Sequence, residues 1–219
     1  MREENIVVAG HALVIARPDD PESLIDESRF DEDEFLPYWA ELWPSGIALA
    51  RHVAELGLDG KRMLELGCGL GLPSFAAALA GAEVVATDWA AEAVGLVALN
   101  AAANGLSVTA AVFSWDSDRA PEIGLFDLVV AADVLYEERN AMPLLGLLDE
   151  TVAPGGEALV ADPGRRHAAR FFAGARAAGW SIEQIPVAAL PAGGIARLRR
   201  DIRGDDARQG AEPPAGRRC

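Results

Sequence analysis

The stretch that decides the fold runs from residue 61 to residue 73 and reads Lys-Arg-Met-Leu-Glu-Leu-Gly-Cys-Gly-Leu-Gly-Leu-Pro. The apolar residues at its start predict a buried strand. Pro73 suits the first turn of a helix, where a missing N–H has no cost. Between them, Gly67, Gly69 and Gly71 predict a turn whose backbone takes positive φ or lets a ligand come close. Such a turn at the carboxyl end of a parallel strand is where nucleotide-like ligands bind in open α/β folds.

Strands and helices alternate along the rest of the chain. Apolar runs predict strands at 83–88, 108–113, 126–132 and 158–161, and helical periodicity predicts helices at 44–56, 73–80, 90–104, 142–152 and 165–178. Two weaker strands are expected at 180–188 and 194–202, and residues 6–15 are expected to form a strand or a hairpin arm. This alternation is typical of a doubly wound parallel sheet.

Two acidic residues narrow the type of ligand. Glu65 lies two residues before the first glycine, at the strand end that faces the turn, and Asp88 ends the next predicted strand. Asp88 follows Gly67 by about 20 residues, the spacing at which an acid meets ribose hydroxyls in dinucleotide folds. A dinucleotide turn also needs a particular third glycine, and the two possible frames have Leu72 and Ser74 there. The alternative interpretation is that Glu65 is a solvated strand end and that Asp88 only caps the following helix.

Composition excludes several classes of protein. The 219 residues are 51% apolar and 24% charged, which indicates a globular domain with a substantial core. The formal net charge of −15 disfavours a nucleic-acid partner, because binding to phosphates calls for a basic surface. No apolar run is long enough to cross a membrane, and the acidic N-terminus is unlike a signal peptide.

Cysteine and histidine are sparse. Cys68 and Cys219 do not suggest a disulfide framework, so we expect a reducing compartment and therefore the cytoplasm. His11, His52 and His167 are dispersed and show no ligand spacing, so no metal site is expected.

Three motifs together resemble a known family. The pattern Glu-x-Gly-x-Gly-x-Gly, followed by an Asp at the end of the next strand, resembles the S-adenosylmethionine (SAM) site of class I methyltransferases. Residues 36–46 read Leu-Pro-Tyr-Trp-Ala-Glu-Leu-Trp-Pro-Ser-Gly, and residues 129–136 read Val-Val-Ala-Ala-Asp-Val-Leu-Tyr. With these two runs, the resemblance covers roughly residues 36–190. It points to the lysine methyltransferase-like group of seven-strand enzymes, which includes the electron-transfer-flavoprotein β-subunit lysine methyltransferase and bacterial proteins resembling nicotinamide N-methyltransferase.

The resemblance implies a fold and a set of site residues. The fold is α/β, a doubly wound, Rossmann-like, seven-stranded sheet whose last strand is antiparallel. The implied cofactor is SAM, and the implied cofactor-binding residues are Trp43, Glu65, Gly67, Gly69, Gly71, Asp88, Trp89, Trp115, Asp116 and Ala132. Asp133 and Tyr136 are the implied catalytic residues, because they match an Asp-x-x-Tyr motif that faces the acceptor amine.

Structural roles remain open for several of these residues. Asp133 can be a strand-end turn residue and Tyr136 a packed aromatic, while Trp43 and Trp115 can be core residues. The segment Asp-Pro-Gly-Arg at 162–165 either borders the substrate opening or forms a simple turn, and we favour the turn.

Chemistry supports an enzyme that methylates an amine. Methyl transfer from a sulfonium is an in-line displacement, so the protein mainly aligns a neutral amine and excludes water. A carboxylate and a phenol at the mouth of a strand can orient that amine and stabilise its growing positive charge. We therefore expect Asp133 and Tyr136 to act on a protein lysine, or on a small amine.

Two further possibilities stand beside this one. The first is a non-catalytic module that binds SAM. The second, a nicotinamide-dependent oxidoreductase, is disfavoured by the missing third glycine. A nucleic-acid amino-methyltransferase usually has two prolines where this chain has Val134 and Leu135.

The chain divides into three predicted parts. Residues 1–45 form an N-terminal extension and substrate-side segment, residues 46–203 form the SAM-binding domain, and residues 204–219 form a disordered tail.

Overall fold

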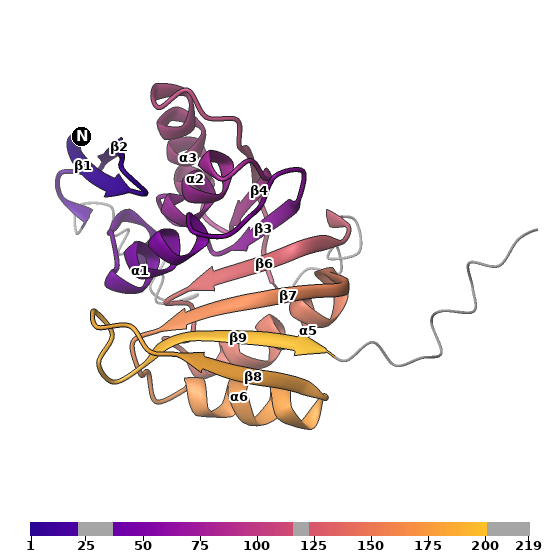
Figure 1. Ribbon diagram of the computed structural model, residues 1–219. Helices are drawn as coiled ribbons and strands as arrows, with labels where there is room; N and C mark the ends of the chain where they lie inside the picture. Colours follow the sequence, from indigo (N-terminus) through magenta and orange to yellow (C-terminus); the bar gives the residue numbers. More distant parts are fainter. Residues whose placement is uncertain (22–36, 116–122, 201–219) are drawn as a thin grey trace, which may run out of the picture.

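A seven-stranded mixed sheet organises the protein. The computed structural model describes residues 1–21, 37–115 and 123–200 (Figure 1). The strands of the main sheet are β3 (Arg62–Leu66), β4 (Glu83–Asp88), β5 (Thr109–Val112), β6 (Phe126–Ala132), β7 (Val152–Asp162), β8 (Trp180–Ile185) and β9 (Gly194–Arg200). Their order across the sheet is β5-β4-β3-β6-β7-β9-β8, and β9 runs antiparallel to both of its neighbours. The doubly wound α/β fold with an antiparallel last strand is therefore confirmed.

Helices cover both faces of the sheet. They are α1 (Pro44–Val53), α2 (Leu72–Leu79), α3 (Ala91–Ala103), α5 (Ala141–Thr151) and α6 (Ala168–Ala177), with short 3₁₀ turns η3 (Tyr38–Ala40) and η4 (Glu138–Asn140). Along β6, Leu128 and Val130 point into the core shared with α1, α2 and α3. Val129 and Ala131 point into the core shared with α5 and α6. A strand buried on both faces reads as a continuous apolar run, and for this reason its bounds were predicted correctly.

A separate N-terminal hairpin packs on α3. It consists of β1 (Arg2–Val8) and β2 (His11–Arg17), paired antiparallel. Asn100 within α3 and Asn104 at its C-cap bond to the backbone of β2 as a neighbouring strand would. The side chain of Asn104 accepts from the N–H of Val14 at 2.9 Å and donates to its carbonyl at 2.8 Å. Asn100 does the same with Ala16, at 2.8 and 3.0 Å.

Two predicted element bounds differ clearly from the structure. The strand expected at 158–161 is much longer, because β7 begins at Val152 and continues through Pro154, Gly155 and Gly156. A Cβ on Gly156 would lie 2.9 Å from the carbonyl oxygen of Asp127, so glycine permits the close approach of β6 there. Helix α1 ends at Val53 and not at residue 56.

The spacing of apolar residues predicts Val94, Val97, Ala98 and Ala101 on the inward face of α3, and the structure differs in part. Ala98 is exposed, whereas Asn100 is buried where it meets the hairpin. Asn100 can be buried on this face because its side chain bonds to the backbone of β2.

Some predictions concern residues that the structure does not describe. The tail at 204–219, the residue Asp116 and most of the acidic segment 19–34 lie outside the described residues. Among the helices that the structure describes, none is both long and apolar enough to cross a membrane.

Candidate functional site

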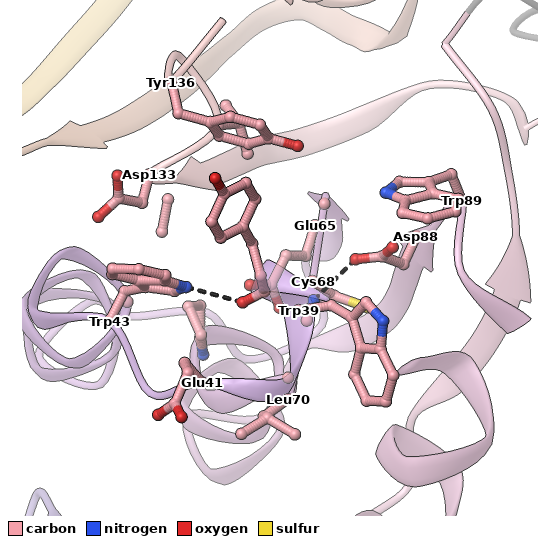
Figure 2. Close-up of a pocket in the computed structure, with 18 of the residues that line it drawn as sticks. Trp39, Glu41, Trp43, Glu65, Cys68, Leu70, Asp88, Trp89, Asp133 and Tyr136 are labelled. Atoms are coloured by element: carbon pink, nitrogen blue, oxygen red, sulfur yellow. Dashed lines mark hydrogen bonds between the residues drawn. The ribbon is translucent and has the colours of Figure 1, made fainter. Parts of the chain in front are cut away.

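One cavity lies at the carboxyl ends of β3, β4 and β6. Its volume is about 400 Å³, which is in the range of small-molecule sites. Figure 2 shows that its walls come from the glycine turn, the strand ends and the segment before α1. It is lined by all of the predicted site residues that the structure describes: Trp43, Glu65, Gly67, Gly69, Gly71, Asp88, Trp89, Trp115, Ala132, Asp133 and Tyr136.

The glycine turn packs too tightly for side chains. Gly67 and Gly71 have φ of 71° and 79°. A Cβ on Gly67 would lie 2.9 Å from Cγ1 of Val134, and one on Gly71 would lie 2.9 Å from Cγ2 of Val97. The turn therefore passes closely between α3 and the segment that follows β6, and α2 begins directly after it at Leu72.

Asp88 holds the turn from the end of β4. Its Oδ2 accepts from the backbone N–H of Gly69 at 2.9 Å, and its Oδ1 accepts from that of Ala90 at 3.0 Å (Figure 2). Burial raises the pKa of this carboxyl, while the N–H bonds lower it. The alternative that Asp88 only caps the following helix is wrong, because the N-cap of α3 is Ala90, the helix has no side-chain cap, and Asp88 lines the cavity.

Glu65 is buried and not solvated. Only 1% of its surface is exposed, and its Oε2 accepts from the backbone N–H of Ser74 at 3.0 Å and from the Ser74 hydroxyl. Ser74 lies in the first turn of α2, so this carboxyl ties β3 to the start of the helix. Burial raises the pKa of Glu65 to about 8. The group is therefore mostly protonated at neutral pH, and a cation placed in the cavity would favour its ionised form.

Aromatic side chains from the segment before α1 and from the end of β6 form another part of the cavity wall. The ring of Tyr38 lies edge-to-face against Trp43 and Tyr136, with centroid distances of 6.1 and 5.2 Å. The indole N–H of Trp43 donates to the carbonyl of Tyr38 at 2.8 Å. Tyr38 was missed as a site residue, although it lies in the quoted run 36–46. Its position could have been inferred from the aromatic spacing in that run.

Two other tryptophans line the cavity on the β4 and β5 side. Trp89 follows Asp88 and is 38% exposed, so a flat ligand could stack on its ring. Cζ2 of Trp115 lies 3.7 Å from the position of a Cβ on Gly67. The roles of both residues stay predictions.

Asp133 is held in place from three sides. Its backbone has a φ of 58°, in the left-handed region, and its N–H donates to the carbonyl of Ala161 at 2.9 Å. The carboxylate accepts from the Ser45 hydroxyl at 3.1 Å through Oδ2. Its Oδ1 accepts from Nε of Arg165 at 2.8 Å and lies 2.7 Å from Nη2.

Arg165 and Ser45 were not predicted as site residues. The turn favoured for residues 162–165 is present, because Oδ1 of Asp162 accepts from the N–H groups of Gly164 and Arg165 at 2.8 and 2.7 Å. That turn also presents the Arg165 side chain to Asp133. An arginine directly after a strand-end turn was the only signal available in the sequence.

Tyr136 retains its proton. Burial and the nearby charge of Glu137 raise the pKa of its phenol to about 12. Tyr136 lines the main cavity and also a second, open hollow formed with Pro163, Gly164, Arg165, Arg166 and His167. At neutral pH the hydroxyl is therefore neutral and available as a hydrogen-bond donor or acceptor.

Sequence comparison identifies lysine methyltransferases as relatives of this chain. A sequence profile of the lysine methyltransferase family matches residues 28–176. The electron transfer flavoprotein beta subunit lysine methyltransferase of Danio rerio is 37% identical over 134 residues, which cover 59% of this chain and 51% of that protein. The EEF1A lysine methyltransferase 3 of Mus musculus is 32% identical over 139 residues, 61% of this chain and 60% of that protein. This chain thus spans little more than half the length of these relatives.

Structural comparison agrees on the fold. The T. thermophilus 16S rRNA N2 G1207 methyltransferase, solved in complex with AdoMet and guanosine, superposes with a TM-score of 0.64 and 16% identity. The match covers 91% of this chain and 50% of that protein. At this identity the likeness concerns the fold alone, which is that of class I methyltransferases.

Proposed function

Because the chain belongs to the lysine methyltransferase family, we propose that it transfers a methyl group from SAM to an amine nitrogen, and that this amine is the side chain of a protein lysine. The observation that carries the proposal is that one cavity has Asp88 and the glycine turn at one end and Asp133 and Tyr136 at the other. A methyl donor and an amine acceptor must meet in such a space.

The cofactor end suits SAM. Asp88 would hold the ribose hydroxyls, Trp89 and Trp115 would flank the adenine, and Glu65 with Gly67, Gly69 and Gly71 would face the methionine part. The predicted role of Asp116 near the adenine belongs to the same proposal. When bound, SAM supplies an electrophilic methyl group on a positively charged sulfur. The negative charge of Asp88 favours a cation at that end, and a bound cation would in turn favour the ionised form of Glu65.

The acceptor end suits an amine. Asp133 and Tyr136 would orient the nitrogen through hydrogen bonds, and Trp43 with Ala132 would border the path of the methyl group. The Tyr38, Trp43 and Tyr136 rings would exclude water from the reacting atoms. Carboxylate and aromatic rings together are also a common environment for an alkylammonium product.

Several features support a protein lysine over other acceptors. The net charge of −15 favours a cationic partner and disfavours a phosphate backbone, so we propose no nucleic-acid substrate. The lysine methyltransferases at 37 and 32% identity act, by name, on a flavoprotein subunit and on EEF1A. The buried, free thiol of Cys68 suits a reducing compartment, for which we propose the cytoplasm. A small amine remains the second candidate, because the cavity would bind the cofactor in the same way.

Isotope transfer tests the proposal. The protein is incubated with methyl-labelled SAM and lysate of its own source, and proteins are then separated from small molecules. We expect label in protein, released as methyllysine after hydrolysis, and less label with the Asp88→Ala variant. Label found only in small molecules would support the second candidate, and no transfer to any acceptor would contradict both.

A further inference from the structure

The carboxylate of Asp133 already has a cationic partner. The guanidinium of Arg165 lies 2.7 and 2.8 Å from Oδ1 through two nitrogens, and the Asp133 side chain is only 4% exposed. The same guanidinium carbon lies 5.8 Å from the centroid of the Trp43 ring. A carboxylate beside an aromatic face is a cation-binding arrangement, and here the chain's own arginine fills it.

Arg165 reaches Asp133 from outside the main cavity. It lines the open hollow together with Tyr136, Arg166 and His167, whereas Asp133 lines the main cavity. Tyr136 belongs to the walls of both spaces. The Arg165 side chain is 35% exposed, so the guanidinium is accessible to solvent while its partner carboxylate is not.

The pairing matters because of the acceptor's protonation state. A lysine arrives as an ammonium and must lose its proton to solvent before its lone pair can attack. An unpaired buried carboxylate would stabilise the ammonium and hold the acceptor in its unreactive form. In the reaction the N–C bond forms as the S–C bond breaks, and the positive charge passes from sulfur to nitrogen. A carboxylate whose charge is balanced by arginine does not favour the ammonium form, so a neutral amine can enter. Its oxygens can still interact with the positive charge of the methylated product.

We propose that Arg165 is a positioning residue that keeps Asp133 paired, so that the acceptor enters and reacts as a neutral amine. The inference rests on the proposed function, since it concerns the same acceptor end. Arg165 thereby becomes part of the acceptor site although it lies outside the cofactor motifs. The hollow at residues 163–167 then belongs to the acceptor side.

Other charged groups near the pair must be taken into account. They are Asp162 at the end of β7, Glu137 and Arg139 after β6, and Arg166 and His167 before α6, with the phenol of Tyr136 and the neutral hydroxyl of Ser45 from α1. Asp162 keeps one buried oxygen without a hydrogen-bond partner, and its pKa is raised chiefly by burial. Arg139 pairs with Glu137, and Arg165 contacts Asp133 directly.

The first test measures the pH profile of methyl transfer in three variants. In Arg165→Gln, the acidic limb of kcat, which reports groups in the enzyme–substrate complex, should move to higher pH by roughly one unit, because the unpaired carboxylate raises the pKa of the bound acceptor amine. Arg165→Lys keeps the charge and should retain the wild-type limb. Arg170→Gln is the matched control, since Arg170 is an exposed residue of α6 that pairs with Glu138, and its limb should not move. An unchanged limb in Arg165→Gln would overturn the proposal.

The second test needs no catalysis and separates the inference from the proposed function. Butylammonium is titrated at pH 7 into protein saturated with S-adenosylhomocysteine, by calorimetry. Arg165→Gln should bind it about tenfold more tightly than the wild type, and the double variant Asp133→Asn/Arg165→Gln should lose that gain. Equal affinity in Arg165→Gln and wild type, with both folded by circular dichroism, contradicts the inference. If the wild type transfers no methyl group to lysine but the tenfold gain is seen, the proposed function fails and the cation site at Asp133 stands.

Discussion

At the residue scale, Glu65 combines a buried carboxyl with a structural bond. The folded protein holds its proton up to about pH 8, whereas the unfolded chain releases it near the ordinary value of 4.5. The folded state therefore binds more protons between these values, and the free energy of unfolding falls as pH rises from about 4.5 to about 8. Ionisation of Glu65 thus destabilises the folded protein when the cavity is empty, and a bound cation would reduce this cost.

The variant Glu65→Gln tests this linkage. Gln resembles the protonated carboxyl, so the variant should match the wild type within about 1 kcal/mol at pH 5 and exceed it by roughly 2–4 kcal/mol at pH 8. Urea unfolding of the protein without ligand, at several pH values, measures the difference. Parallel pH curves for variant and wild type would contradict a raised pKa at this position.

Asp88 is the second residue with a direct consequence. The variant Asp88→Ala should weaken SAM binding by roughly 1–3 kcal/mol, because charge-assisted bonds to the ribose are lost. Calorimetric titration gives the affinity, and Glu92→Ala, an exposed acid at the start of α3, is the control. NAD should not bind to the wild type, and binding of NAD in place of SAM would refute the cofactor assignment.

At the element scale, α3 acts as a neighbour strand for the hairpin. Asn100 and Asn104 satisfy both backbone groups of Ala16 and Val14, so the open edge of β2 is covered by side chains. Arg17, at the end of β2, then pairs with Glu4 on β1 and with Glu41 of the cavity wall. The hairpin is thereby connected to the segment that carries Tyr38 and Trp43.

Removing one of these amides should loosen the hairpin. The variant Asn104→Ala leaves two backbone groups of Val14 without their partners and should cost about 1–3 kcal/mol. Hydrogen exchange at the Val14 amide should accelerate by at least tenfold. The control Leu99→Ala, at a side chain that is 66% exposed, should change neither stability nor exchange. Slow exchange at Val14 in Asn104→Ala would show that the amide pairing contributes little.

At the scale of the whole molecule, the last strand limits what can be removed. Deleting residues 204–219 should leave the melting temperature and SAM affinity unchanged, because their composition cannot support a packed core. Deleting 197–219 also removes Leu198, which is fully buried in β9, and should lower the melting temperature by roughly 10 °C or more. Thermal unfolding of both truncations is the measurement. A large drop for the shorter deletion would show that the tail docks on the domain.

Most of the fold could be predicted from short-range patterns. The strand at 126–132 and the glycine turn were correct because apolar runs and turn glycines are local signals. The start of β7 was missed, since Pro154, Gly155 and Gly156 usually end an element, and only the neighbouring β6 explains their extended path. Asn100 was missed for the same kind of reason, because its partner lies 84 residues away in the chain.

The candidate site was predictable in its cofactor half and less so at its acceptor end. Glu65 and Asp88 follow fixed spacings from the glycines. Arg165 lies 32 residues after Asp133 and meets it only because β6 and β7 are adjacent and parallel. No spacing rule relates the two positions, so the pair required the tertiary structure.

The antiparallel insertion of β9 has a consequence for biosynthesis. This strand lies between β7 and β8 but leaves the ribosome after both of them. Until it is made, β7 presents an open edge that includes the buried residues Leu159 and Ala161, and β8 lacks the strand that joins it to the sheet. Open apolar edges recruit other chains. A nascent chain stalled before residue 194 should therefore depend on chaperones, and a product terminated there should accumulate in inclusion bodies.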